Sequence, residues 1–340
     1  MARRIGDPPT LAQSIAGYLG AHDSAAFTPS QPAMASEMLA IALEERDLER
    51  AIEAYEFRLE SWIELGELAA AYADLSEMSR LADELRQPAQ QWIIGVYRAF
   101  LALLEGRFAE AEGLIETTHA LGERASAWTA NASHDMQLFL LRREQGRLGD
   151  VEHVIRRAAA ESPTYPILRC ALTSALAELG ATDGARRELD QLAADGFSGI
   201  PFDEEWSASL ALLAEAAVAL GDVERSAVLY ELLLPYADRL TVSYTEISLG
   251  PVARFLGNLA AVLGRFDVAA GHLRDAAAFS ARIGARPSLA HAQAELARLL
   301  SRQGDSDDSR ALALSTRALY LELGMDVYAS GLETLIGSPP

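Results

Sequence analysis

Histidine and carboxylate side chains are the residues of this chain that could do chemistry, because imidazoles and carboxylates bind metal ions and transfer protons. The six histidines are His22, His119, His134, His153, His272 and His291, and no two of them stand four residues apart. No His-Glu-x-x-His motif occurs, so the sequence predicts no zinc site. The acidic run at 305–308 begins like a calcium loop but lacks the glycine and the distal glutamate of one, so helix capping is the preferred interpretation.

Motifs for nucleophilic catalysis and for nucleotide binding are also missing. The chain has no Gly-x-Ser-x-Gly elbow and no Gly-x-Gly-x-x-Gly loop, and it contains no lysine, which a Walker A motif requires. The single cysteine, Cys170, lies in an apolar run, which predicts a small buried residue rather than a nucleophile. Nothing selects one catalytic pair from 49 acidic residues. We therefore predict no catalytic residue, no cofactor and no bound metal, and we expect a protein that is not an enzyme.

The charge balance restricts the partners that the chain can have. Aspartate and glutamate number 49 against 29 basic residues, all of them arginine, and the formal net charge is −20. Such a surface repels phosphate backbones and anionic lipids, so we expect no direct nucleic-acid partner and no membrane. The sequence has neither an apolar run long enough to span a membrane nor a secretory signal. We expect a cytoplasmic protein, and the lysine-free, alanine-rich composition is typical of a bacterium with a GC-rich genome.

Glycines recur at a nearly constant interval at the ends of helical patterns. They are Gly66, Gly106, Gly146, Gly180, Gly221, Gly264 and Gly304, with spacings of 40, 40, 34, 41, 43 and 40 residues. Glycine ends a helix readily because it adopts the left-handed backbone conformation without a Cβ clash. Two positions after the glycine, the residue is large and apolar in five repeats of seven, and five positions after it the residue is small in six of seven. The large residue can fold back over the first helix, and the small one lets the two helices of a pair approach closely.

These columns predict an all-α fold, a right-handed solenoid of about eight tetratricopeptide-like helix pairs with a period near 40 residues. We expect a single domain over residues 1–336, with an N-terminal pair at 9–45, seven repeats centred on the seven glycines, and a flexible tail at 337–340. Two connections are longer, at 195–201 before an N-cap at Asp203, and at 235–244. The stretch 241–245 is the sole weak candidate for a strand.

Five residues are the candidates for ligand or partner binding: Trp92, Trp128, Asn131, His134 and Gln137. In a solenoid, the first helix of each pair lines the concave surface, where tryptophans can anchor a partner. Asn131, His134 and Gln137 interrupt the apolar pattern of the helix that carries Trp128, as contacts to a polar ligand would. Two alternatives stay open, because packing between repeats explains the tryptophans and a solvated face explains the polar residues.

The chain resembles a known family in the packing motifs at 106–112 (Gly-Arg-Phe-Ala-Glu-Ala-Glu) and at 264–269 (Gly-Arg-Phe-Asp-Val-Ala), and also at 2–8, 85–88, 234–236 and 284–287. The family is the tetratricopeptide-like half of large actinobacterial regulators, the LuxR-type or cyclase-linked signalling ATPases. The resemblance covers nearly the whole chain and implies a helical repeat that works beside an ATPase module. ATP hydrolysis and cyclase activity do not carry over, because the chain has no Walker A motif and no cyclase domain. It is either an excised domain or a stand-alone relative.

We therefore expect a non-catalytic protein-interaction or effector-sensing module of a bacterial signalling or transcription regulator. It would bind a peptide, a protein or a small effector on its concave face. The resemblance implies an upstream ATPase or regulator domain as the protein partner, and homo-oligomerisation stays open. One alternative is an enzyme or small-molecule-binding protein that uses the solenoid cavity, which a buried polar cluster with shifted pKa values would favour. The other alternative is a structural oligomerisation scaffold.

Overall fold

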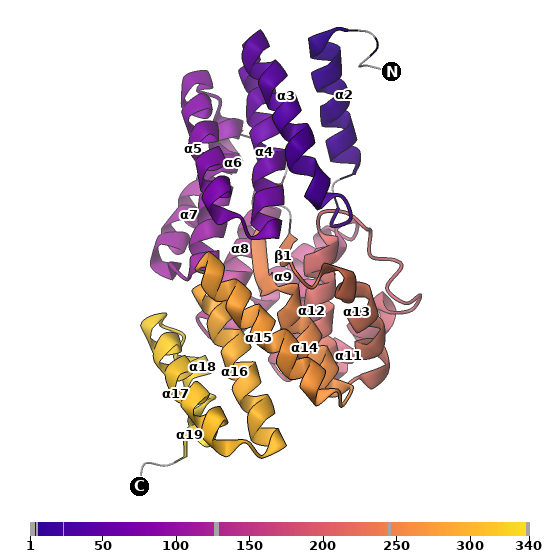
Figure 1. Cartoon of the computed structure of the whole chain (residues 1–340), viewed down its shortest axis with the longest axis vertical. Helices are drawn as coiled ribbons and strands as arrows, with labels where there is room; N and C mark the ends of the chain where they lie inside the picture. Colours follow the sequence, from indigo (N-terminus) through magenta and orange to yellow (C-terminus); the bar gives the residue numbers. More distant parts are fainter. Residues whose placement is uncertain (1–3, 5, 23, 126–128, 244–245, 338–340) are drawn as a thin grey trace.

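The structure is a computed structural model that describes residues 4, 6–22, 24–125, 129–243 and 246–337 (Figure 1). Its first half contains the helices α2 (Pro8–Ala21), α3 (Gln31–Glu45), α4 (Leu48–Leu65), α5 (Leu68–Leu85), α6 (Pro88–Glu105), α7 (Phe108–Ala125), α8 (Ala130–Glu144), α9 (Glu152–Glu161), α10 (Pro166–Glu178) and α11 (Thr182–Leu192). Its second half contains α12 (Trp206–Ala219), α13 (Val223–Leu233), the strands β1 (Leu240–Ser243) and β2 (Ile247–Pro251), α14 (Val252–Val262), α15 (Phe266–Ile283), α16 (Arg286–Gln303), α17 (Ser306–Glu322), α18 (Asp326–Ser330) and α19 (Glu333–Ile336). Short 3₁₀ turns lie at η1 (Thr28–Ser30), η2 (Leu148–Asp150) and η3 (Leu234–Tyr236).

The described helices from α2 to α17 form eight successive pairs, and the two helices of each pair pack against each other. In Figure 1 helices α2 to α4 lie toward one end of the long axis, α17 to α19 toward the other and α11 to α15 across the middle, and the two ends of the chain lie at opposite ends of the molecule. The prediction of an all-α repeat of tetratricopeptide-like helix pairs is therefore confirmed. Each pair buries a helical stripe on its neighbour, and the buried apolar residues form two large clusters that each span several pairs.

The seven predicted glycines all end the first helix of a pair in the left-handed conformation, with φ between +63° and +86°. The turn after α4 is an example. There the Gly66 N–H donates to the carbonyl of Ile63, and the Glu67 N–H donates to the carbonyl of Trp62 at 2.7 Å. These two bonds satisfy carbonyls that a helix end leaves without partners. The glycine spacing therefore places the boundary between the two helices of each repeat correctly.

The start of the second helices follows the polar residues that the sequence indicates. Asp222 and Asp305 accept backbone N–H bonds at the starts of α13 and α17. Asp203 was expected to cap the helix that carries Trp206. Its carboxylate accepts from the Glu205 N–H at 3.1 Å, one turn before α12 begins at Trp206. Side-chain caps of this kind typically stabilise a helix by about 1 kcal/mol.

The small-residue column is buried in every repeat: Ala71, Ala111, Val151, Ala185, Ser226, Ala269 and Ser309 are at most 5% exposed. The large apolar column behaves differently. Leu68, Phe108 and Leu148 are buried as expected, but Val223 is 56% and Phe266 is 42% exposed. The expectation that this residue folds over the first helix is thus wrong for these two repeats. The two helices of a pair can approach closely only if the residue in the small-residue column is small. The burial of the large apolar residue depends instead on whether a neighbouring helix covers it.

A β-hairpin interrupts the helices between α13 and α14. β1 pairs with β2 in antiparallel register, with Leu240 opposite Pro251 and a bulge between Thr241 and Val242. The predicted strand at 241–245 coincides with β1 in part, and its residues 244 and 245 lie outside the described residues. The second strand was not anticipated. All five residues of β2 are buried, so it lacks the alternation of apolar and polar residues that identifies a half-exposed strand.

The C-terminal helices pack back onto the ends of three first helices. The contacts are Phe279 and Arg282 at Gly66, Pro287 and Leu323 at Gly106, and Val327 at Gly146. A Cβ added to any of these three glycines would lie within 2.6 Å of the neighbouring side chain. The glycines at 180, 221, 264 and 304 have no such neighbour. Contacts between distant repeats therefore join the two halves of the molecule, and the array is not open along its whole length.

A helix lies close to each end of the chain. The N-terminal pair predicted at 9–45 corresponds to α2 and α3. Residues 338–340 of the predicted tail lie outside the described residues, and Gly337 directly follows α19. In the part of the chain that the structure describes, every helix is too short or too polar to cross a membrane.

Candidate functional site

A cavity of about 310 Å³ lies between the first helices of five successive pairs, α8, α10, α12, α14 and α16. Its polar lining consists of Arg143, Glu144, Ser174, Glu178, Glu215, Arg254, Asn258, His291, Glu295 and Arg298. Apolar side chains such as Val218 and Phe255 complete the wall. First helices thus line the concave surface here, as expected for a solenoid. The volume is in the range of small-molecule sites, which begins at about 300 Å³.

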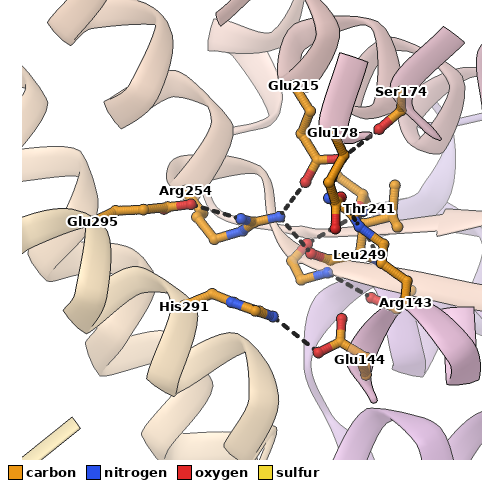
Figure 2. Close-up of polar contacts among 12 residues, drawn as sticks. Arg143, Glu144, Ser174, Glu178, Glu215, Thr241, Leu249, Arg254, His291 and Glu295 are labelled. Carbon is orange, nitrogen blue, oxygen red and sulfur yellow. Dashed lines mark hydrogen bonds and ion pairs between the residues drawn. The ribbon is translucent and has the colours of Figure 1, made fainter. Parts of the chain in front are cut away.

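Alternating arginines and glutamates cross the cavity as a chain of ion pairs (Figure 2). The Arg143 guanidinium binds Glu178 at 2.7 Å and Glu215 at 2.9 Å. The other oxygen of Glu215 binds Arg254 at 2.8 Å, and Arg254 binds Glu295 at the same distance. The five residues come from α8, α10, α12, α14 and α16 in that order, so each first helix contributes one charge. The chain of ion pairs therefore connects all five repeats at the cavity.

The buried carboxylate of Glu215 is stabilised in its charged form. Burial alone would raise its pKa, but the guanidinium groups of Arg143 and Arg254 outweigh this and lower the pKa to about 2. Burial alone would likewise lower the pKa of Arg254, but the carboxylates of Glu295 and Glu215 raise it instead. Glu215 and Arg254 therefore stay charged at neutral pH, and the walls of the cavity present charges that are held in place before a ligand arrives.

A second set of contacts joins α8 to the C-terminal helices across the same cavity. His291 Nε2 lies 2.9 Å from Glu144 Oε2, and His291 Nδ1 lies 2.9 Å from the Tyr320 hydroxyl. The Tyr328 hydroxyl donates to the backbone carbonyl of Arg143 at 3.0 Å. Burial would raise the pKa of Glu144, but His291 and then Arg143 outweigh this and lower it. The cavity therefore lies at the join between the two halves, and some of its lining residues also hold the halves together.

Chemically, this arrangement suits binding better than group transfer. Every cationic or anionic group on the cavity floor already has a partner, so an incoming ligand meets fixed dipoles and apolar walls. Arg298 is exposed at the rim and forms no ion pair with any described residue, so its guanidinium is free to bind an acidic or hydrogen-bonding group. Within the described residues, no group of three or more histidine, cysteine, aspartate or glutamate side chains is arranged to hold a metal ion.

The sequence contains a signal for this cavity that differs from the tryptophans and from the polar interruptions on the helix of Trp128. Six positions before the glycine that ends the first helix, the last four repeats carry a polar residue: Ser174, Glu215, Asn258 and Arg298. All four line the cavity. At the same position, two of the earlier repeats have Phe100 and Leu140, which are buried. Counting back from a fixed helix end selects one face of every first helix, and an unbroken run of polar residues there marks this cavity, whereas the isolated Glu60 of the repeat that ends at Gly66 does not line it.

Two of the predicted binding residues are covered by the protein itself. Trp92 is 8% exposed and lies where a Cβ on Gly122 would meet its indole. Gln137 is 2% exposed, and its amide donates to the carbonyls of Val96 and Glu246 at 3.0 and 3.1 Å. The burial of Trp92 agrees with the packing alternative given for the tryptophans, whereas Gln137 is too buried for the solvated face that was its alternative. Neither residue lines the cavity between α8 and α16.

Asn131 and His134 lie on α8, where both contact His119 of α7. Asn131 is exposed and its carbonyl oxygen lies 2.9 Å from His119 Nε2. The His134 ring stacks on the His119 ring with centroids 4.1 Å apart, and its Nδ1 lies 3.0 Å from a carboxylate oxygen of Asp135. Trp128 lies outside the described residues. Of the four candidates that the structure describes, Asn131 and His134 lie at an accessible surface, and a binding role for them stays a prediction.

Cys170 gives a direct test of the described core. The side chain is fully buried, as the sequence predicted, and burial raises the pKa of its thiol to about 12. The thiol is therefore protonated and shielded at neutral pH, so we expect a disulfide reagent at pH 8 to modify Cys170 only at the rate of unfolding. Stopped-flow absorbance with and without denaturant measures both rates. Rapid stoichiometric reaction of the native protein would contradict the described packing of α10.

Comparisons with known proteins add little to this geometry. No family model matches the chain, and no curated protein sequence matches it. Among solved structures, the chain is similar to yeast Tom70 at 13% sequence identity, with a TM-score of 0.31 and 89% of each chain covered. The description of the fold therefore rests on the helices, caps and contacts of this chain alone.

Proposed function

We propose that this protein is a non-catalytic, effector-sensing module that binds a small ligand in the cavity between α8 and α16. The observation that supports this is the chain of buried ion pairs from Arg143 to Glu295, which lines a hollow of about 310 Å³. Charges in a protein interior are costly unless each is paired, so a core built only for packing would fill this space with apolar side chains. A hollow with fixed charges instead provides both volume and specific polar contacts.

Ligand binding in the cavity would also shift the equilibrium between a joined and a separated arrangement of the two halves. The cavity is bounded on one side by α8 and on the other by α16, α17 and α18, and the contact between Glu144 and His291 connects the two sides. A ligand that touches both sides binds the joined arrangement better than a separated one, and this differential affinity is what shifts a conformational equilibrium. The shape of the array would then report the presence of the ligand to a protein partner.

A cavity-blocking variant tests the proposal. Ala219 is exposed at the cavity rim, and a tryptophan there would fill the mouth without replacing any charged residue. Ala278 on α15 is also exposed but lies outside the cavity, so Ala278→Trp is the matched control. We expect a screen of small metabolites by thermal shift to yield compounds that stabilise the wild type and the control, and stabilise Ala219→Trp at least about tenfold more weakly.

Two results would contradict the proposal. The first is a screen in which no compound stabilises the folded wild type. The second is a set of hits that stabilise Ala219→Trp and Ala278→Trp equally, because such compounds bind elsewhere. Hits that are peptides rather than metabolites would place the function in the broader class of peptide binding on the concave face.

The wider role follows from the resemblance stated for the sequence. We propose that the module acts within a bacterial signalling or transcription regulator, where occupancy of the cavity biases an ATPase or regulator domain. Its partner would be a protein, and nucleic acid would not bind the chain directly because of its net charge of −20. Co-purification from the source cells with and without a hit compound tests this coupling.

A second candidate function, an enzyme that uses the same cavity, has one observation in its favour. Hydrogen bonds link Glu144, His291 and Tyr320 in that order. Enzymes with an activated nucleophile link an orienting acid, a base and a hydroxyl group in the same order. The Tyr320 side chain is only 1% exposed, and burial raises its pKa, so the hydroxyl is neither accessible nor activated. The structure therefore favours binding. Turnover of a hit compound by the wild type, lost in His291→Gln, would favour the enzyme.

A further inference from the structure

Two buried glutamates lie close enough at the β-hairpin for the charge of Glu246 to act on Glu205, and neither lines the cavity. Glu205 is the residue before α12, and Glu246 lies in the turn that joins β1 to β2. Glu205 is 7% exposed and Glu246 is 1% exposed. Two ionised carboxylates in one dry site repel each other, and such a pair holds a proton that separate carboxylates would release.

The hydrogen bonds of this pair come from hydroxyl groups rather than from cations. The Tyr165 hydroxyl donates to one oxygen of Glu205, and the second oxygen, Oε2, has no hydrogen-bond partner among the described residues. Glu246 accepts from Ser133 at 3.0 Å and from Ser243 at 2.9 Å. A hydroxyl group can donate to a carboxylate or accept from a protonated carboxyl, so the site accommodates either protonation state of the pair.

The charged groups around the pair do not neutralise it. Glu204, the adjacent residue on the same segment, adds a third carboxylate and raises the pKa of both members. The arginines of the surrounding elements are engaged elsewhere. Arg239, before β1, binds Glu64 of α4, and Arg254 of α14 binds Glu215.

These surroundings raise the pKa of both glutamates. Burial raises the pKa of Glu246 to about 7. Burial also raises the pKa of Glu205 well above its usual value, and the neighbouring Glu246 charge adds to this effect. At least one carboxyl group of the pair therefore keeps its proton at pH values where an exposed glutamate has lost it.

The hairpin that covers the pair holds the two halves of the molecule together. On one side, the Gln137 amide of α8 donates to the Glu246 carbonyl, and Ser207 of α12 donates to the Val242 carbonyl. On the other side, Leu249 of β2 lines the cavity, and its carbonyl accepts from Arg254 at 3.3 Å. Movement of the hairpin would therefore change both the join between α8 and α12 and one wall of the cavity.

We propose that Glu205 and Glu246 share a proton that fastens the β-hairpin to α8 and α12, and that loss of this proton to solvent releases the hairpin. The pair then acts as a proton-operated latch between the two halves of the array. With the proton present, the hydrogen bonds to Tyr165, Ser133 and Ser243 hold one negative charge at most. With the proton gone, two charges remain with no counter-ion among the described residues around them, and separation of the hairpin from α12 relieves their repulsion. The latch does not depend on whether the cavity binds a ligand.

The sign of the pH effect follows from proton counting. The folded protein binds the shared proton more tightly than the unfolded chain, so stability falls as pH rises between the pKa of an exposed glutamate, about 4.3, and that of the pair. Glu246→Gln removes one charge, keeps the shape and weakens the effect, because Glu205 then keeps only the part of its raised pKa that burial and Glu204 cause. Between pH 5.5 and pH 8.5, we expect the unfolding midpoint of the wild type to fall by about 3 °C or more relative to that of Glu246→Gln.

Hydrogen exchange measures the latch directly. Between the pKa of an exposed glutamate and that of the pair, the opening of segment 240–251 should become up to about tenfold more frequent per pH unit, after correction for intrinsic exchange, and the increase should be less steep in Glu246→Gln than in the wild type. Glu84→Gln, which replaces an exposed glutamate, is the matched control and should follow the wild type. If Glu246→Gln does not fold, Glu205→Gln provides the same test.

Infrared difference spectra of the wild type provide a readout that needs no variant. The carbonyl stretch of a protonated carboxyl group should be present at pH 6 and lost by pH 8.5. Parallel pH profiles of wild type and glutamine variants, or the absence of this band at pH 6, would overturn the proposal.

Discussion

Glu215→Gln is expected to destabilise the folded protein by about 3–5 kcal/mol, the typical cost of removing one partner from a buried ion pair. The carboxylate of Glu215 lies between Arg143 and Arg254, at 2.9 and 2.8 Å. A glutamine has nearly the same shape but no charge, so two buried guanidinium groups would lose the charge between them and face each other. Chemical denaturation at pH 7 measures the difference from the wild type.

The pH dependence of this variant provides an independent check. Because the pKa of Glu215 is lowered to about 2, its contribution is fully present above the pKa of an exposed glutamate and is lost as pH falls toward 2. The stability difference between wild type and Glu215→Gln should therefore shrink below pH 4. The control is Glu188→Gln, because Glu188 pairs with Arg169 at a half-exposed position and should contribute less than about 1 kcal/mol. A Glu215→Gln variant as stable as this control would mean that the ion-pair chain contributes nothing.

Gly146→Ala is expected to destabilise the protein by about 2–4 kcal/mol, whereas Gly180→Ala should cost about 1–2 kcal/mol. Both glycines end a first helix with positive φ, +69° and +75°, so both variants carry the same backbone strain. Only at Gly146 would the new Cβ also collide, because it would lie 2.7 Å from the Cβ of Val327. A clash between two Cβ atoms cannot be relieved by rotating a side chain, so α18 must move away from α8.

The pair of variants separates a local effect from a long-range one. Differential unfolding measures the free energies, and hydrogen exchange of α18 and of the end of α8 shows where protection is lost. We expect Gly146→Ala to raise exchange in both segments and Gly180→Ala to leave α18 unchanged. Equal losses of stability in the two variants, with α18 protected in both, would indicate that the contact between Val327 and Gly146 does not hold the halves together.

Much of this architecture could be predicted from the sequence, because it depends on interactions between residues close in the chain. A glycine such as Gly106 ends a helix through its own backbone conformation, and a small residue such as Ala111 permits close approach of the next helix whatever lies beyond it. The burial of Cys170 follows in the same way from the apolar run around it. These features repeat in each pair, so weak local signals reinforce one another across the chain.

The cavity and the join between the halves were decided only by the tertiary structure. His291 and Glu144 are 147 residues apart, and no local pattern indicates that these two side chains meet. The large residue at Phe266 has the same local pattern as Phe108, yet it is exposed because no helix covers it. β2 lacked a strand pattern because both of its faces are buried. The sequence by itself therefore determined the helix pairs and their boundaries, whereas the curvature of the whole array determined which charges face one another, because contacts between distant repeats set that curvature.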